Sequence, residues 1–121
     1  MSRRIVIADA HEASRAGMET MLQPLGAELQ VLPSYQLPDP AWADGNAPDV
    51  VIVSVIGAIG DQEQRFINQL LTQELKVIVI AGALDWQQAR ALFLSGVYDV
   101  FTRETPAQEL LQSVSAGLGA T

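Results

Sequence analysis

The sequence predicts an α/β fold in which a parallel sheet of five strands lies between two layers of helices. Short runs rich in β-branched residues recur at residues 5–8, 50–53, 77–80 and 97–101. The first three runs are apolar at nearly every position, which is typical of strands that helices cover on both faces. Helical patterns fill the gaps between the runs. This alternation predicts a three-layer (βα)5 fold.

A further run, residues 27–32, alternates polar and apolar side chains and is interpreted as an edge strand. The usual strand order of a (βα)5 three-layer fold is 2-1-3-4-5, and we expect this parallel order here. In such sheets a ligand site lies beyond the carboxyl ends of the strands, where the first and third strands diverge. The residues expected there are Asp9, Ala10, Ser54, Ala81 and Arg103.

Capping signals delimit the two helices that follow the fourth and fifth strands. Asp85 with Gln88 forms a variant of the capping box, and Gly96 is well placed to end that helix. Its buried line is expected to be Trp86, Ala89 and Phe93. In the last helix we expect Thr105 to be the cap, Pro106 the first helical residue and Gln108 the box partner.

The connection between the second and third strands, residues 33–48, is the least regular. It contains four prolines and Gly45, and only residues 41–43 have helical character. We expect a short or irregular helix there.

Composition limits the possible functions. The 121 residues, 49% of them hydrophobic, suit one compact domain that spans residues 1–121. Seven Lys and Arg against fourteen Asp and Glu give a net charge of −7, which argues against binding of nucleic acid by this domain. The chain has no Cys, which excludes disulfides and zinc–thiolate sites. No apolar run is long enough to be a signal peptide or a membrane span, so we expect a cytoplasmic protein without membrane contact.

Four motifs together resemble the receiver domains of bacterial response regulators, which share the flavodoxin-like fold. Residues 4–18 resemble the opening strand, acidic pair and first helix of these domains, and residues 48–54 resemble the strand that ends in the phosphoryl-accepting Asp. Residues 76–82 look like the fourth strand, and residues 95–106 look like the fifth strand with its Lys. The pattern is closest to receivers that are linked to helix-turn-helix outputs. The resemblance implies phosphorelay signalling in a two-component system, with a role in transcription regulation.

Against that family pattern, the phosphoryl-acceptor site is degenerate. Asp9 remains, but Ala10 replaces the second acid and Ser54 stands at the acceptor position. Ala81 replaces the hydroxyl residue, Val100 replaces the switching aromatic residue, and Arg103 replaces Lys. Mg²⁺ usually needs one or two carboxylates in addition to phosphate, and Ser54 has no evident base. We therefore predict a pseudo-receiver that is not an enzyme, with no catalytic residue, metal or cofactor.

Structural roles are the simpler interpretation of the individual residues. Asp9 can cap the first helix or pair with Arg103, and His11 can be part of the local structure. Trp42 and Trp86 are expected to pack in or near the core. Asp49 and Asp61 are poorly placed to serve as substitute acceptors.

The remaining function is contact with a protein partner. In receivers the fourth helix, fifth strand and fifth helix commonly form the partner or dimer face. That face would include parts of residues 85–94, 98–101 and 105–114. We expect a protein partner or a homodimer there, with the face fixed or controlled by something other than phosphate.

Two ligand-binding alternatives share the fold. Asp9-Ala10-His11 and Ser54-Val55-Ile56 are similar to the Asp-x-His-x-x-Gly and Ser-x-Leu elements of cobalamin-binding domains, although Ser14 replaces the Gly. A flavin or nucleotide site needs a phosphate-cradling loop after the first strand, where this chain is acidic instead.

Overall fold

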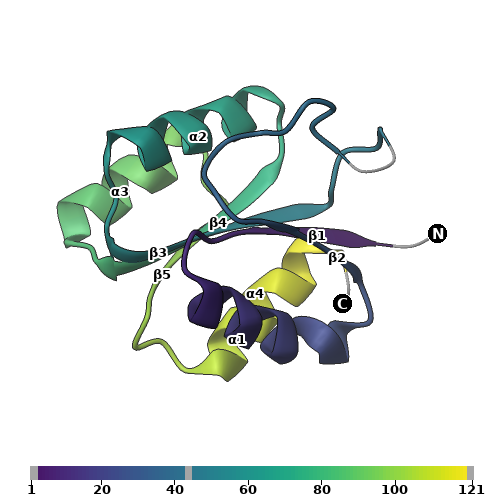
Figure 1. Ribbon diagram of the computed structural model, residues 1–121. Helices are drawn as coiled ribbons and strands as arrows, with labels where there is room; N and C mark the ends of the chain where they lie inside the picture. The colour runs from purple at the N-terminus through teal and green to yellow at the C-terminus, as the bar shows by residue number, and fades with distance from the viewer. Residues whose placement is uncertain (1–2, 43–44, 120–121) are drawn as a thin grey trace.

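The computed structural model describes residues 3–42 and 45–119 and contains a sheet between two helical layers (Figure 1). The strands are β1 (Arg4–Ala8), β2 (Glu28–Leu32), β3 (Val50–Ala58), β4 (Lys76–Ala83) and β5 (Asp99–Thr102). The helices are α1 (Glu12–Leu22), the short 3-10 helix η1 (Gln23–Leu25), α2 (Asp61–Thr72), α3 (Trp86–Ser95) and α4 (Ala107–Gly117).

The sheet is parallel throughout and has the order β2-β1-β3-β4-β5, as the sequence predicts. Figure 1 shows α1 and α4 on one face of the sheet and α2 and α3 on the other. The predicted three-layer fold is therefore confirmed, and it brings the carboxyl ends of β1 and β3 side by side.

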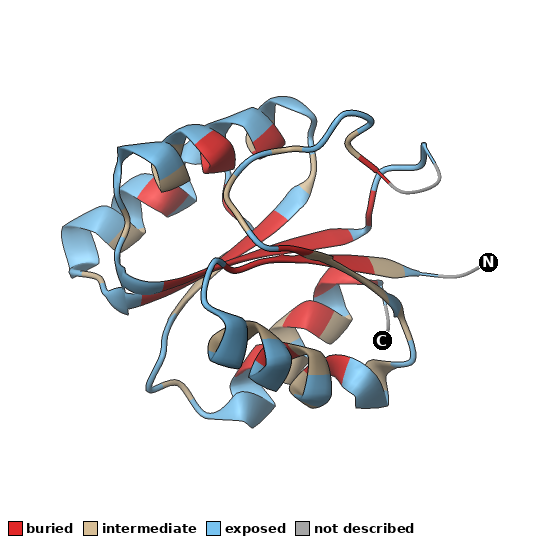
Figure 2. Cartoon of the chain, in the orientation of Figure 1, coloured by how far each residue is buried: buried red, intermediate tan, exposed pale blue. Residues whose placement is uncertain are grey.

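Alternate residues of the strands enter two separate hydrophobic clusters. Isoleucines of β1, β3 and β4 (Ile5, Ile7, Ile52, Ile78, Ile80) pack against α1 and α4. Valines of the same strands (Val6, Val51, Val53, Val55, Val77, Val79) pack against α2 and α3. The burial colours of Figure 2 show the resulting red sheet between helices that are blue on their outer sides. Successive side chains of a strand point to opposite faces of the sheet, and helices cover both faces. These strands are therefore apolar at almost every position.

The helix ends agree with the sequence at α3 and differ at α4. Asp85 and Gln88 form a complete capping box, and Gly96 ends α3 in the left-handed conformation. The prediction for Thr105 is wrong: α4 follows Pro106 as its N-cap and has no side-chain cap. The Thr105 hydroxyl instead accepts a hydrogen bond from the backbone N–H of Thr102 at 3.3 Å.

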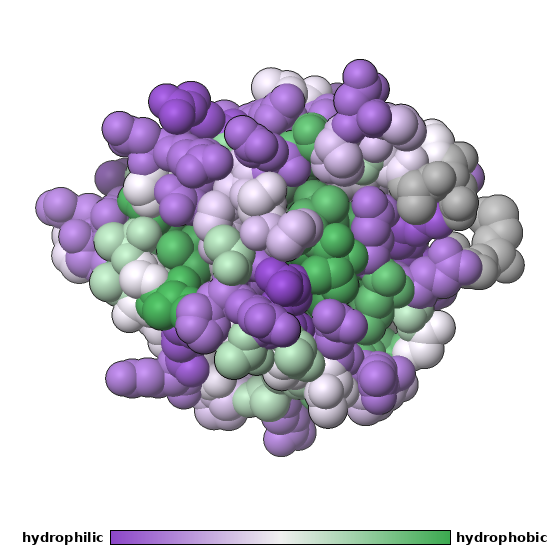
Figure 3. All heavy atoms as spheres, viewed as in Figure 1, coloured by the Kyte–Doolittle hydropathy of each residue, from purple (hydrophilic) through white to green (hydrophobic). Residues whose placement is uncertain are grey.

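The predicted buried line of α3 is also wrong. Trp86 is 70% exposed, Phe93 is about half exposed, and Leu92 is the one residue of α3 that is buried. Leu94 is 73% exposed. The helix therefore turns large apolar side chains toward solvent. In Figure 3 most of the visible face is hydrophilic, and hydrophobic atoms reach the surface in a central band and on the side where α3 lies.

The connection between β2 and β3 is irregular, and its described residues contain no helix. Trp42 is buried in the cluster on the side of α2 and α3, so it is a core residue as expected. Ala43, the end of the expected helical segment, lies outside the described residues.

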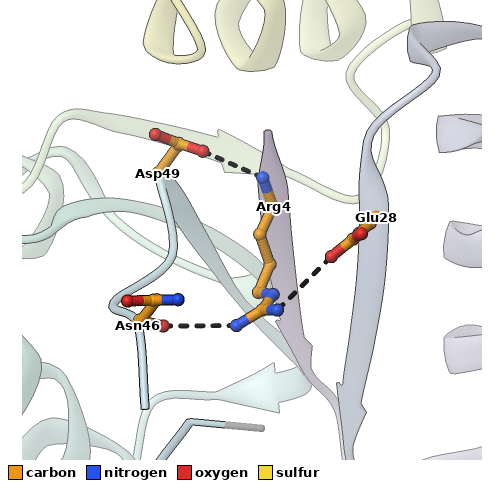
Figure 4. A network of polar contacts seen from close by, with 4 residues as sticks. All are labelled: Arg4, Glu28, Asn46 and Asp49. Carbon is orange, nitrogen blue, oxygen red and sulfur yellow. Dashed lines mark hydrogen bonds and ion pairs between the residues drawn. The ribbon is translucent and has the colours of Figure 1, made fainter. Parts of the chain in front are cut away.

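Arg4 ties the sheet together at the end opposite the candidate site (Figure 4). Its backbone N–H donates to Asp49 Oδ2 at 2.8 Å, and its guanidinium donates to the Asn46 carbonyl and pairs with Glu28 at 3.3 Å. These contacts hold β2 and the segment before β3 against β1. Across residues 3–42 and 45–119, no helix is long and apolar enough to cross a membrane.

Candidate functional site

Asp9 directly follows β1, and its side chain is fully buried. Oδ1 accepts a hydrogen bond from the His11 backbone N–H at 2.9 Å, and Oδ2 accepts one from the Ser14 hydroxyl at 2.6 Å. Arg15 donates to the Asp9 carbonyl at 2.9 Å. His11 is the N-cap of α1, and its Nδ1 accepts from the Ser14 N–H. Both carboxylate oxygens of Asp9 therefore stabilise the turn into α1.

Arg103 follows β5 and reaches back across the sheet end. Its Nη1 donates to Ser54 Oγ at 2.9 Å and to the Val55 carbonyl at 3.3 Å, while Nη2 donates to Ser14 Oγ. No ion pair joins Arg103 to Asp9 in the described part of the chain. The Ser14 hydroxyl connects them instead, because it accepts from the guanidinium and donates to the carboxylate.

Ser54 is not the strand-end residue that the sequence suggests. It is fully buried within β3, which continues through Ala58, and β4 likewise continues through Ala83. Val55 pairs with Ala81 and Ala58 pairs with Ala83, so β3 carries one extra residue in a bulge. The two strands thus extend beyond the position where the family pattern places the acceptor.

Gly82 makes this extension possible. A Cβ atom at Gly82 would overlap the carbonyl oxygen of Ile56 and lie 3.5 Å from Arg103 Cδ. The backbone of β4 approaches the bulge at Ile56 more closely than any residue with a side chain allows.

Tyr35, from the connection after β2, completes the network. Its hydroxyl donates to the Ser54 carbonyl at 2.6 Å and accepts from the Ala10 N–H at 3.4 Å. Burial raises the pKa of Tyr35 above its usual value of 10.0, and the charges of Asp9 and Glu63 raise it further. The Ala10 hydrogen bond and Arg103 act in the opposite direction. The neutral phenol is therefore the form that the site holds.

The structure brings four of the six predicted pocket residues together and separates two. Asp9, Ala10, Ser54 and Arg103 meet through Ser14 and Tyr35, as the contacts above show. Ala81 is buried in β4, and Val100 is half-buried against the cluster on the side of α2 and α3. Neither makes a polar contact with the network.

Two members of the network have no clear signal in the sequence. Tyr35 lies in a proline-rich connection without periodicity. Ser14 is one of several polar residues of α1, and Arg103 lies 89 residues away from it along the chain. Only the fold reveals these contacts.

The arrangement holds backbone segments in place, because its hydrogen bonds end on the carbonyls of Asp9, Ser54 and Val55 and on the N–H groups of Ala10 and His11. In the described ranges, no group of three or more His, Asp or Glu side chains is placed to hold a metal ion. Every buried side-chain N or O atom of the described residues has a hydrogen-bond partner. The Ser54 hydroxyl accepts from Arg103 and the Ser54 carbonyl accepts from Tyr35, so both polar groups of this residue have partners within the chain.

Comparison with known proteins places the fold among receivers. No family model and no curated protein matches the chain. Several solved structures do. A response regulator from Thermotoga maritima has a TM-score of 0.80 and 14% identity, over 98% of this chain and 99% of that one. A response regulator receiver protein from Pseudoalteromonas atlantica has a TM-score of 0.76 and 18% identity, over 98% and 99%.

A response regulator receiver domain from Clostridium thermocellum is similar too, with a TM-score of 0.78 and 17% identity over 97% of this chain and 94% of that one. The chain therefore has the fold of response-regulator receiver domains, as the sequence predicts.

Proposed function

We propose that the chain is a receiver-like signalling domain of the two-component type that is not phosphorylated and acts by contact with a protein partner or a second copy. It catalyses no reaction at the strand ends and works in the cytoplasm. The observation that supports this most strongly is the closed network of Asp9, Ser14, Arg103, Ser54 and Tyr35. It occupies the place where a receiver of the usual pattern has its acceptor and acidic pair.

The first argument concerns the metal ion. Mg²⁺ dehydrates reluctantly and is held by carboxylates together with phosphate oxygens. Asp9 is the only acid of the network, and both of its oxygens accept hydrogen bonds from the chain itself. Ala10 supplies no second carboxylate. A metal ion here would find a single carboxylate, whose oxygens already hold Ser14 and the His11 N–H.

The second argument concerns the nucleophile. A serine hydroxyl needs an adjacent base to become reactive. The side-chain partner of Ser54 Oγ is the guanidinium of Arg103, which donates hydrogen bonds and cannot accept a proton. Ser54 is also fully buried, so a phosphodonor cannot approach it without opening the sheet end.

The third argument concerns the surface of α3. Trp86 and Leu94 lie one on each side of Arg90 along the helix and are largely exposed, and Tyr98 is partly exposed just before β5. α3 carries no acid, although the chain has a net charge of −7. Large exposed apolar side chains with a neighbouring Arg are typical of protein interfaces.

Incubation with acetyl phosphate and Mg²⁺, followed by intact-mass spectrometry, tests the proposal. We expect no phosphoryl adduct, while a phosphorylatable receiver treated in parallel gains one. The variant A10D/S54D/R103K restores the charged groups of the family pattern. It shares the fold of the unmodified chain, so it is the matched comparison for the unmodified chain. A phosphoryl adduct on the unmodified chain, on any residue of the network, would overturn the proposal.

A further inference from the structure

A small hollow lies between α1, α4 and β5, next to the network, and Arg103 belongs to both. Its volume is about 150 Å³, and its apolar lining consists of Met18, Met21, Ile80, Phe101, Ala107 and Leu110. Its polar lining consists of Thr102, Arg103 and Thr105. Figure 1 shows α1 and α4 together beneath the sheet, with the connection from β5 to α4 beside them.

We propose that this hollow binds a small carboxylic acid with a compact apolar body, such as a substituted benzoic or branched short-chain acid. The size and lining of the hollow indicate the apolar part. A cavity of about 150 Å³ holds a molecule the size of benzene. Ile80, Leu110 and Met18 are buried core residues that offer an apolar floor. Methionine side chains adapt readily to the shape of a ligand.

The charge at the rim indicates the carboxylate. Arg103 uses Nη1 and Nη2 in the network, but none of the hydrogen bonds of the described residues involves its Nε. The edge formed by Nε and Nη2 therefore retains donors, and this is a geometry that carboxylates bind in a bidentate manner. A ligand on this edge leaves the bonds to Ser54 and Val55 in place.

The start of α4 points to the same ligand class. Ala107 is both the first residue of α4 and part of the lining, and no side chain caps the first N–H groups of the helix. Uncapped N–H groups and the helix dipole favour a negative charge at this end. Glu104 and Glu109 are nearby acids that disfavour an anion, but both are exposed and neither belongs to the lining.

Methyl NMR of the protein labelled at methionine tests the inference directly. Benzoate should shift the Met18 and Met21 signals saturably, with a dissociation constant of roughly 1 mM for a ligand of this size. Benzyl alcohol, which has the ring without the charge, should bind about tenfold more weakly. Acetate, which has the charge without the ring, should give no saturable shift.

Two pairs of variants test the charged rim and the apolar hollow separately. Arg103→Gln should weaken benzoate to the affinity of benzyl alcohol, whereas Arg65→Gln, at an exposed position of α2, should change nothing. Ala107→Leu should fill the hollow and abolish both ligands, whereas Ala116→Leu, at an exposed position of the same helix, should not.

Several results would overturn the inference: absence of saturable shifts at Met18 and Met21, equal affinity of benzoate and benzyl alcohol, or full binding by the Ala107→Leu variant. The Ala107→Leu pair keeps the test decisive if Arg103→Gln perturbs folding. The inference goes beyond the proposed function, and the two fail separately because the phosphorylation assay does not involve the hollow.

Discussion

The carboxyl ends of the strands and the outer face of α3 differ in whether their side chains have partners within the chain. At the strand ends, Asp9, Ser54 and Arg103 are bonded to one another or to the backbone, directly or through Ser14. On α3, Trp86 and Leu94 lie largely uncovered. The first region is arranged for stability, and the second has the features of a contact surface. These differences motivate the proposal that the receiver fold of this chain has lost its phosphoryl-transfer site and contacts a partner through α3.

The largest expected effect comes from breaking the strand extension beside the network. Gly82→Ala places a methyl group on the carbonyl oxygen of Ile56, so β3 and β4 must separate. We expect a loss of about 3 kcal/mol or more in the free energy of unfolding, measured by urea denaturation. Gly57→Ala, which meets no atom within 4 Å, is the control and should be nearly neutral. Equal stability of the two variants would show that the extension is not formed.

Removal of the buried carboxylate is expected to have the next largest effect. Asp9→Ala leaves the Ser14 hydroxyl and the His11 N–H without their acceptor, which should cost about 2–3 kcal/mol in urea denaturation. In a site where several acids crowd together, removal of one relieves repulsion and stabilises the fold. A stability gain in Asp9→Ala would therefore contradict the network described above. Asp61→Ala, at an exposed position of α2, is the matched control.

Loss of the Tyr35 hydroxyl should have a smaller effect that depends on pH. Tyr35→Phe removes the donor to the Ser54 carbonyl and should cost about 1 kcal/mol at neutral pH. Because the pKa of Tyr35 is raised in the folded protein, this contribution is complete below the ordinary value of 10.0 and is lost as pH rises through the folded pKa. Urea denaturation at neutral and strongly alkaline pH should show the difference between wild type and variant shrinking. A difference that grows with pH would exclude the raised pKa.

The smallest effect on stability is expected on α3, together with a loss of association. Trp86→Ala and Leu94→Ala should each change the free energy of unfolding by less than about 0.5 kcal/mol, because both side chains are exposed. Any self-association seen by analytical ultracentrifugation, or binding of a partner, should weaken in both variants. Gln62→Ala, at an exposed position of α2, should leave association unchanged. Association that survives both α3 variants would place the interface elsewhere.

The sequence predicts the sheet well because its information is local and repetitive. β-Branched runs, a capping box at Asp85 and a glycine at position 96 each specify structure within a few residues, and all three are confirmed. The extension of β3 is missed because Ser54 interrupts the β-branched run and Gly57 and Ala58 do not continue it. Its cause is the packing of Gly82 against Ile56, which the linear pattern does not show.

The candidate site is predicted only in part, for a related reason. The family pattern identifies Asp9, Ser54 and Arg103, but the side chains that join them come from α1 and from the connection after β2. On α3 the sequence offered Trp86, Ala89 and Phe93 as a buried line, and the structure buries Leu92 instead. In a short helix whose apolar residues lie on several sides, periodicity alone cannot decide which side faces the core.

Titration with Mg²⁺, followed by amide NMR of Ala10, Ser54 and Arg103, tests the central claim most directly. Receivers that are phosphorylated use the metal, so its binding is the first requirement of the chemistry. For this chain we predict only small, unsaturated shifts at these amides, and saturable binding in the A10D/S54D/R103K variant. Saturable shifts around Asp9 in the unmodified chain would contradict the account, because they would show that the network opens to admit a metal ion.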